Sequence, residues 1–181
     1  MIRMKQFAIR NEISSQQLKT KRKELNLTQK EFAELIGVSK PTIERWETSD
    51  KSITGPIVLL IHLLTPDYVK GLRIPEKELP LRLWYMYKDE VCTLIDVDEA
   101  KRLVRIRNYT ENRQFRAFGA NENPDFSDYE DFLKSRCFAE SRDKMKLILR
   151  DLNLPFYDPF MIIEKTQGRM AEDDFWIKVE R

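Results

Sequence analysis

The chain has 181 residues, of which 41% are hydrophobic and 34% are charged, and its formal net charge is +2. This composition indicates a soluble protein with a real hydrophobic core, built as one domain or as two small ones. No apolar run approaches the ~20 residues that span a bilayer, which excludes a membrane-spanning helix. The first residues lack the apolar core of a signal peptide, and Cys92 and Cys137 show neither disulfide-framework nor zinc spacing. We therefore expect a cytoplasmic protein.

Charged and aromatic residues are distributed unevenly along the chain. Residues 1–75 hold 13 Lys and Arg against 8 Asp and Glu, whereas residues 76–181 hold 19 against 22. The first part contains 4 aromatic residues and the second part contains 15. The segment GLRIPEKELP, with Pro75 and Pro80, is typical of a boundary. We therefore expect two domains, residues 1–75 and residues 76–181.

Helical patterns fill the N-terminal part. Ser14 and Gln17 are spaced as a capping box, which predicts a helix that starts there and runs to about Asn26. Thr28 is placed to cap a second helix, and Gly37 follows its last apolar residue, where a left-handed residue ends a helix at low cost. Both helices carry apolar residues on one face, so we expect them to share a core.

A third and a fourth helix follow. Ser39 is placed to cap the third, and Pro41 falls in its first turn, where a missing N–H group costs nothing. The apolar run of residues 57–64 predicts a fourth helix that is nearly buried. His62 is the only histidine, and we interpret it as a side chain packed in this run rather than a catalytic one.

The second and third helices, joined by a tight glycine turn, match a helix-turn-helix unit, whose second helix enters the major groove of DNA. Any helical hairpin could show the same apolar spacing, so the outward face decides between the two interpretations. Lys40, Thr42, Glu44 and Arg45 lie on that face, and Lys, Thr and Arg are residue types that bond base edges. Gln29 is placed either for a phosphate or for bracing the third helix. The pattern therefore favours DNA binding.

The stretch LKTKRKELNLTQKEFAELIGVSKPTIERWE, residues 18–47, closely resembles the XRE/Cro-type repressor family. The resemblance extends over about residues 17–64, a quarter of the chain. It implies a compact helical domain that binds double-stranded operator DNA as a symmetric homodimer. It also implies a pair between Arg22 and Glu47 that ties the first helix to the third.

The same resemblance implies which residues contact DNA. It places four residues of the third helix at base-facing positions and Gln29 beside a base or a phosphate. After the third helix, TSDKSITGP departs from the family's loop, where Lys51 and Ser52 are candidates for phosphate contacts. The residues expected to contact DNA are Gln29, Ser39, Lys40, Pro41, Thr42, Arg45 and Lys51.

After residue 80 the apolar period changes from helical to alternating, which predicts an α+β domain with an antiparallel β-meander and helices. Short polar turns separate the strands, and a last short strand is placed to pair with an edge of the sheet. The expected strands are 81–87, 91–97, 103–109 and 174–180, and the expected helices are 129–137, 142–152 and 158–166.

No catalytic constellation stands out in either part. No serine lies in a nucleophile elbow, and the five glycines form no phosphate-binding loop. The acids of DVDE, residues 96–99, suggest either Mg²⁺ binding or, preferably, turn formation, and EDD, residues 172–174, is interpreted as a solvated loop. Cys92 and Cys137 are interpreted as small core residues. We therefore expect no enzyme activity, no metal site and no cofactor.

The 15 aromatic residues of the second part exceed what a small core demands. We expect some of them to face outward and to bind a protein, because aromatic side chains are typical interface anchors. The alternative is that they fill the space between the sheet and the helices. The candidate partner-binding residues are Trp84, Tyr87, Phe156, Tyr157 and Phe160.

Three stretches of the second part look like the small module that accompanies HipA-type toxin kinases in some bacterial operons. They are LWYMYKDEVCTLIDVD, FLKSRCFAESRDKMKLILRDLNL and KTQGRMAEDDFWIKVE. This resemblance implies a toxin-antitoxin setting with a cognate toxin as partner. The sequence thus predicts a sequence-specific transcriptional repressor of the antitoxin type. The alternative is a protein-interaction adaptor whose helix-turn-helix mainly mediates dimerisation.

Overall fold

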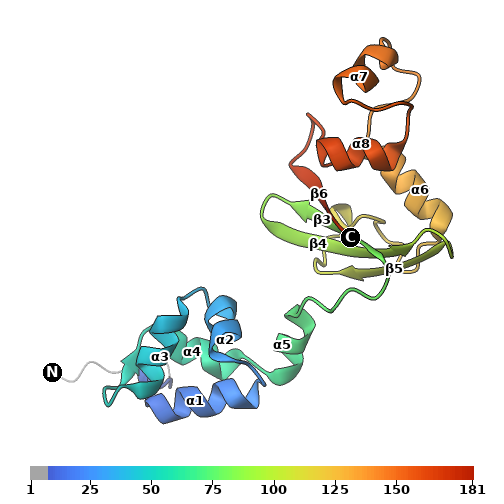
Figure 1. The fold of residues 1–181 in the computed structure, drawn as a ribbon. Coiled ribbons are helices and arrows are strands. Elements are labelled where there is room, and N and C mark those ends of the chain that lie inside the picture. The colour runs from blue at the N-terminus through green and yellow to red at the C-terminus, as the bar shows by residue number, and fades with distance from the viewer. Residues whose placement is uncertain (1–7) are drawn as a thin grey trace. The chain divides into compact units, whose positions relative to one another are not determined.

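The structure, a computed structural model, describes residues 8–181 of the chain. The chain divides into two compact units, Met1–Ile74 and Pro75–Arg181 (Figure 1). The first unit is helical, and the second combines an antiparallel four-stranded sheet with helices, which confirms the predicted fold class. Within residues 8–181, every helix is too short or too polar to span a bilayer.

Helices and a two-stranded ribbon form the described part of the first unit. Their bounds are β1 Glu12–Ile13, α1 Ser15–Glu24, α2 Gln29–Leu35, α3 Lys40–Thr48, β2 Ile53–Thr54, α4 Pro56–Leu63 and α5 Pro66–Leu72. In the antiparallel ribbon, Glu12 lies opposite Thr54. Neither the ribbon nor α5 was predicted, since two-residue strands are too short to show an alternating pattern and Gly71 of α5 belonged to the predicted boundary.

The starts of α1 and α2 follow directly from the sequence. The amide of Gln17 donates to Ser14 Oγ at 3.2 Å, and the Ser14 amide donates back to Gln17 Oε1 at 2.9 Å. Thr28 and Glu31 form the same reciprocal pair ahead of α2, at 3.2 Å and 2.7 Å. These capping boxes satisfy amide groups that the start of a helix leaves without an intrahelical partner.

The core of the first unit forms between helices and ribbon. Leu18 of α1, Phe32 of α2 and Ile43 of α3 are fully buried there. Because one large apolar side chain from each of the three helices meets in this core, burial fixes which faces of α2 and α3 remain outside.

The predicted fourth helix is present as α4, but the prediction that it is nearly buried is wrong. Ile57 and Ile61 of α4 are buried, but Leu59 is 48% exposed and Leu63 is 66% exposed. His62 is also exposed, which corrects its interpretation as a packed side chain. An apolar run of this kind carries few polar residues to mark its outer face, so its periodicity cannot show which residues face solvent.

The second unit runs from strands to helices and back to a strand. Its elements are β3 Leu81–Tyr87, β4 Glu90–Asp98, β5 Leu103–Asn108, the 3₁₀ turn η1 Arg113–Phe115, α6 Phe126–Ser135, α7 Met145–Asp151, α8 Pro159–Thr166 and β6 Phe175–Glu180. The strand order is β5-β4-β3-β6 with antiparallel pairs throughout. The expected last strand therefore does pair with an edge of the meander, beside β3.

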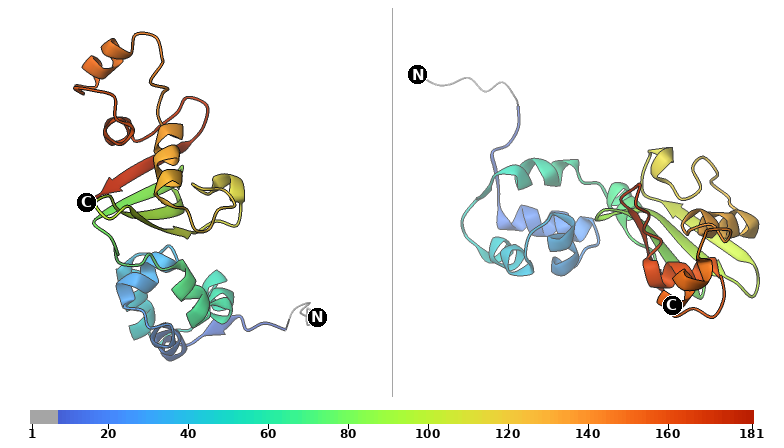
Figure 2. Two further views of the ribbon diagram at one scale, coloured as in Figure 1. Left: turned by 90° about the vertical axis from the view of Figure 1, so that its right-hand side faces the viewer. Right: turned by 90° about the horizontal axis from the view of Figure 1, so that it is seen from above.

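Helices cover one face of this sheet. Leu83 and Tyr85 of β3 point to that face, where they pack with Tyr129 and Phe132 of α6 and with Ile163 of α8. Figure 2 shows α6 and α8 lying against the sheet in two further views. Most of the aromatic side chains of the second unit contribute to this layer, so a large part of the aromatic excess fills the core.

A smaller apolar cluster supports α7. Its buried members are Cys137, Leu154 and Ile162. Figure 1 shows α7 beyond α8, on the side away from the sheet. Cys137 in this cluster and Cys92 in the sheet core are both buried, which confirms their prediction as small core residues.

Two buried arginines pair with residues of the acidic stretches. Asp96 of DVDE lies within β4 and forms a bidentate pair with Arg82, at 2.6 Å and 2.7 Å, which corrects its interpretation as a turn residue. Asp98 does accept the Lys101 amide in the turn, at 3.0 Å, as predicted. The EDD stretch is an exposed loop, as predicted, and its Asp173 pairs with Arg136 at 2.7 Å and 3.1 Å. Arg136 also donates to the carbonyl of Gly168, so it fastens the loop before β6 to the end of α6.

Candidate nucleic-acid interface

The turn between α2 and α3 is set by one glycine and by local hydrogen bonds. Gly37 has a φ of +70°, a left-handed conformation that glycine adopts without strain, and the Val38 amide then closes onto the Ala33 carbonyl at 2.9 Å. Ser39 stands at the start of α3, but its hydroxyl bonds the Thr42 hydroxyl at 2.9 Å. Ser39 therefore occupies the predicted N-cap position of α3, but its side chain bonds no backbone amide there.

The outward face of α3 carries polar and charged side chains. Lys40, Pro41 and Arg45 are exposed, and Thr42 is half-buried. Within residues 8–181, the Arg45 guanidinium forms no ion pair, so its five donors are available to a ligand. Figure 1 shows α1 and α2 next to α3.

Glu44 is a further residue of this face that the predicted DNA contacts left out. Its carboxylate lies 2.9 Å from the Lys40 ammonium, and both side chains are about half exposed. A carboxylate on a reading helix can accept from a cytosine amino group, whereas it repels phosphate. The sequence already indicated that Glu44 lies on this face, because Glu44 precedes Arg45 on the same helical surface.

The Arg22–Glu47 pair ties α1 to α3. Arg22 Nε donates to Glu47 Oε1 at 2.6 Å, and Arg22 Nη2 donates to Oε2 at 2.9 Å. The remaining guanidinium nitrogen, Nη1, donates to the Leu27 carbonyl at 2.9 Å. The side chains are 12% and 2% exposed, so the pair is largely removed from water.

Gln29 belongs to the same network. Its side-chain amide donates to Glu47 Oε2 at 2.9 Å, so in this structure it braces α3 and does not project toward a phosphate. Burial of the Glu47 carboxylate opposes its ionisation, but the hydrogen bonds from Arg22 and Gln29, together with the nearby positive charge of Arg22, outweigh that effect and lower the pKa of Glu47. The three side chains therefore form a charged, hydrogen-bonded network that supports α3 from behind its outward face.

Lys51 lies in the loop after α3. The Lys51 amide donates to Ser49 Oγ at 3.0 Å, and the Ser15 hydroxyl donates to the Ser49 carbonyl at 2.6 Å. These bonds anchor the loop to the start of α1 and leave the Lys51 side chain exposed. The structure thus places an accessible cation beside the C-terminal end of α3.

The five predicted partner-binding aromatics lie in different environments. Trp84 and Tyr87 are half-buried on β3, where the Trp84 indole donates to Glu180 at 2.8 Å and Tyr87 packs against other aromatic rings. Tyr157 and Phe160 are also half-buried, Phe160 against the sheet core and Tyr157 in the cluster beneath α7. Of the five, Phe156 alone is exposed, at 58%.

Comparison with known proteins agrees with the geometry of the first unit. Residues 18–62 match the model of the family described as Helix-turn-helix, of the XRE type. No curated protein and no solved structure matches the chain, and the HipA-type resemblance of the second part gains no support. Among residues 8–181, no cluster of three or more His, Cys, Asp and Glu side chains is arranged to hold a metal ion. The match of residues 18–62 to a helix-turn-helix family model agrees with the geometry of α2 and α3 and supports a role as a DNA-binding transcription regulator.

Proposed function

We propose that this chain is a sequence-specific transcriptional repressor that reads operator DNA through α3. The observation that carries the proposal is the outward face of α3, with Arg45 unpaired within residues 8–181 and Lys40, Thr42 and Glu44 beside it. Arginine can bond guanine O6 and N7 together, and such a contact gives base discrimination. Lys51 in the following loop supplies a charge suited to a phosphate.

Arg45→Ala is expected to weaken operator binding by ~1–3 kcal/mol and to relax base preference at one position. Lys51→Ala is the matched control, because loss of a phosphate contact weakens binding to all sequences similarly. The measurement is a titration of both variants with operator and random duplexes at several salt concentrations. Log K should fall with log salt by about 0.9 per phosphate contacted. An equal loss on operator and random DNA for Arg45→Ala would reject the base-reading role.

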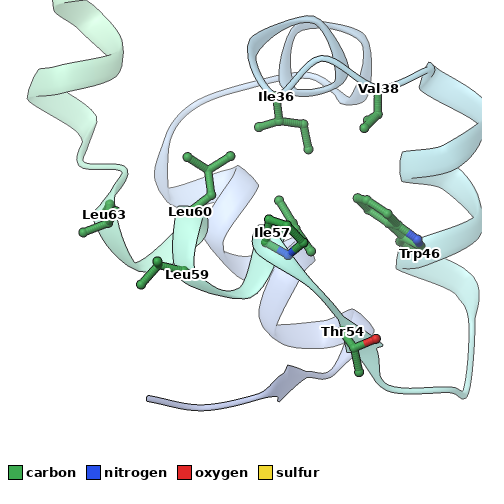
Figure 3. Close-up of a pocket in the computed structure, with 9 residues that line it drawn as sticks. Ile36, Val38, Trp46, Thr54, Ile57, Leu59, Leu60 and Leu63 are labelled. Atoms are coloured by element: carbon green, nitrogen blue, oxygen red, sulfur yellow. The ribbon is translucent and has the colours of Figure 1, made fainter. Parts of the chain in front are cut away.

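The repressor is proposed to act as a homodimer joined through an apolar hollow beside α4. The hollow has a volume of about 520 Å³ and is open to solvent, and Figure 3 shows the side chains that line it. Leu59 and Leu63 lie at its edge and are the exposed apolar residues of α4. In a two-fold contact the same surface serves both copies, so leucines of each copy can enter the hollow of the other. The lining residues are Ile36, Val38, Trp46, Thr54, Pro56, Ile57, Leu59, Leu60 and Leu63.

Changing Leu59 and Leu63 together to serine is expected to raise the dimer dissociation constant at least tenfold. The change removes buried apolar area from the contact, and in a two-fold dimer this loss occurs twice, once for each copy of the chain. Analytical ultracentrifugation measures the effect, with Leu72→Ser as control, since Leu72 is exposed on α5 outside the hollow. A dimer that tolerates the double change but not Leu72→Ser would place the contact elsewhere.

The second unit is proposed to bind a partner protein, and the chain to act as an antitoxin that represses its own operon. The support for partner binding is the exposed aromatic side chain of Phe156, at 58%. The support for the antitoxin role is the resemblance of its three quoted stretches to modules of HipA-type operons. A short downstream gene overlapping this one would favour an antitoxin, whereas an isolated gene would favour an ordinary repressor.

A further inference from the structure

A groove lies between α7 and the segment that follows it. It has a volume of about 580 Å³ and is lined by Lys146, Leu149, Arg150, Asn153, Leu154 and Pro155. Three of the lining residues are apolar, Leu149, Leu154 and Pro155. Phe156, which follows Pro155 in the chain, is 58% exposed. A concave surface with apolar side chains in its lining and an exposed aromatic residue next in sequence is typical of an interaction site.

The segment that carries Phe156 is held in place from both sides. Leu154 is buried in the small cluster beneath α7. The Tyr157 hydroxyl donates to the Phe138 carbonyl at 2.9 Å and lies 3.3 Å from Cys137 Sγ. Because its neighbours are anchored, the outward position of Phe156 is fixed before any partner arrives, which reduces the entropy lost on binding.

The charges of the groove define the kind of partner. Its lining contains two cations, Lys146 and Arg150, and no carboxylate. This contrasts with the second part as a whole, where 22 Asp and Glu exceed 19 Lys and Arg. The carboxylate nearest to Arg150 is that of Asp151, at 3.8 Å with both side chains about three-quarters exposed, and such a pair is easily exchanged for a new one.

We propose that this groove binds a segment of a partner protein that carries Asp or Glu residues around an aliphatic or aromatic anchor. The anchor packs on Leu149 and Pro155, next in sequence to the exposed Phe156, and the carboxylates pair with Lys146 and Arg150. The inference rests on the proposed binding of a protein by the second unit, and it names the surface and the chemistry of that partner. A concave site with cations at its edge fits a protruding peptide better than a flat anionic membrane.

The test selects peptides on the full-length chain. Phage-displayed random 16-residue peptides are selected on the wild type and depleted on the Leu149→Ser/Pro155→Ser variant, which changes two lining residues, so the survivors depend on the groove. Survivors enriched in Asp or Glu beside Leu, Phe or Trp are expected. An absence of survivors, or survivors that are basic or uncharged, would overturn the proposal. Binding of anionic vesicles by the wild type but not by this variant, without peptide enrichment, would assign the surface to a membrane instead.

The selected peptide then serves as a probe in fluorescence anisotropy. Lys146→Glu/Arg150→Glu and Leu149→Ser/Pro155→Ser should each raise its dissociation constant at least tenfold. Leu103→Ser and Lys165→Glu are the matched controls, since both residues are exposed outside the groove. The peptides are already selected to lose binding to the apolar variant, so unchanged binding in the charge variant alone would refute the proposal. Operator binding measured on the same proteins separates this outcome from a failure of the proposed repressor function.

Discussion

Asp96→Ala is expected to lower the free energy of unfolding of the second unit by ~3–5 kcal/mol, because it leaves the buried Arg82 charge without its partner. The two side chains are 3% and 7% exposed. Asp96 Oδ2 also accepts the Glu78 amide at 2.9 Å, while Arg82 donates to the Pro75 carbonyl at 2.7 Å. The change therefore removes the pair and one bond that orders the first residues of the unit.

Hydrogen exchange of the sheet amides measures this loss in the full-length chain. Asp131→Ala is the control, since it removes the exposed pair of Asp131 with Lys134 at 2.9 Å and should cost ~0–1 kcal/mol. The double variant Arg82→Met/Asp96→Leu should recover part of the stability, since it replaces both charges by apolar groups. A cost below 1 kcal/mol for Asp96→Ala would show that solvent reaches Arg82 easily.

Glu47→Ala is expected to destabilise the first unit by a similar ~3–5 kcal/mol. The change leaves the Arg22 guanidinium without its carboxylate partner, and it removes the acceptor of the Gln29 side-chain amide. For a unit of this size, 1 kcal/mol corresponds to about 4–8 °C in melting temperature, so the shift should exceed about 12 °C. Glu24→Ala, which removes a more exposed pair with Lys21, is the control. A shift of a degree or two for Glu47→Ala would contradict a buried pair.

The same pair should make the stability of the first unit depend on pH. The pKa of Glu47 is lowered in the folded state, below its usual value of about 4.3 in an unfolded chain. The unfolded state therefore binds a proton first, and the contribution of Glu47 is present above about pH 4.3 and lost as the pH falls through the folded value. Glu47→Gln should show a smaller decrease in stability over this acidic range.

Local signals were the part of the fold that could be predicted from the sequence. The Thr28 and Glu31 capping box and the left-handed Gly37 depend on neighbours in the chain, and both appear in the structure. The strands of the second unit were recognised by their alternation, and β3 has the predicted bounds. The comparison with known families supports the helix-turn-helix assignment for residues 18–62.

Properties that depend on distant partners could not be predicted. Asp96 was interpreted as a turn residue because its partner Arg82 is 14 residues away in sequence, on the facing strand. The aromatic residues within 156–160 were all predicted to face outward, but they occupy different environments. Tertiary packing alone distinguishes the exposed Phe156 from Tyr157, whose hydroxyl bonds the Phe138 carbonyl. The run of residues 57–64 likewise lacked a polar stripe that would have marked Leu63 as exposed.

The position of β6 in the sheet has a consequence for how the protein forms during synthesis. β6 pairs along β3, with Tyr87 opposite Phe175, so about ninety residues must follow β3 before its second neighbour exists. The helices of the first unit contact one another over short sequence distances and can fold as soon as they emerge. Until β6 is made, β3 is paired with β4 on one side only. The backbone groups on its other side remain open to pairing with another nascent chain. The interval between translation of β3 and of β6 is therefore when this protein is most exposed to aggregation.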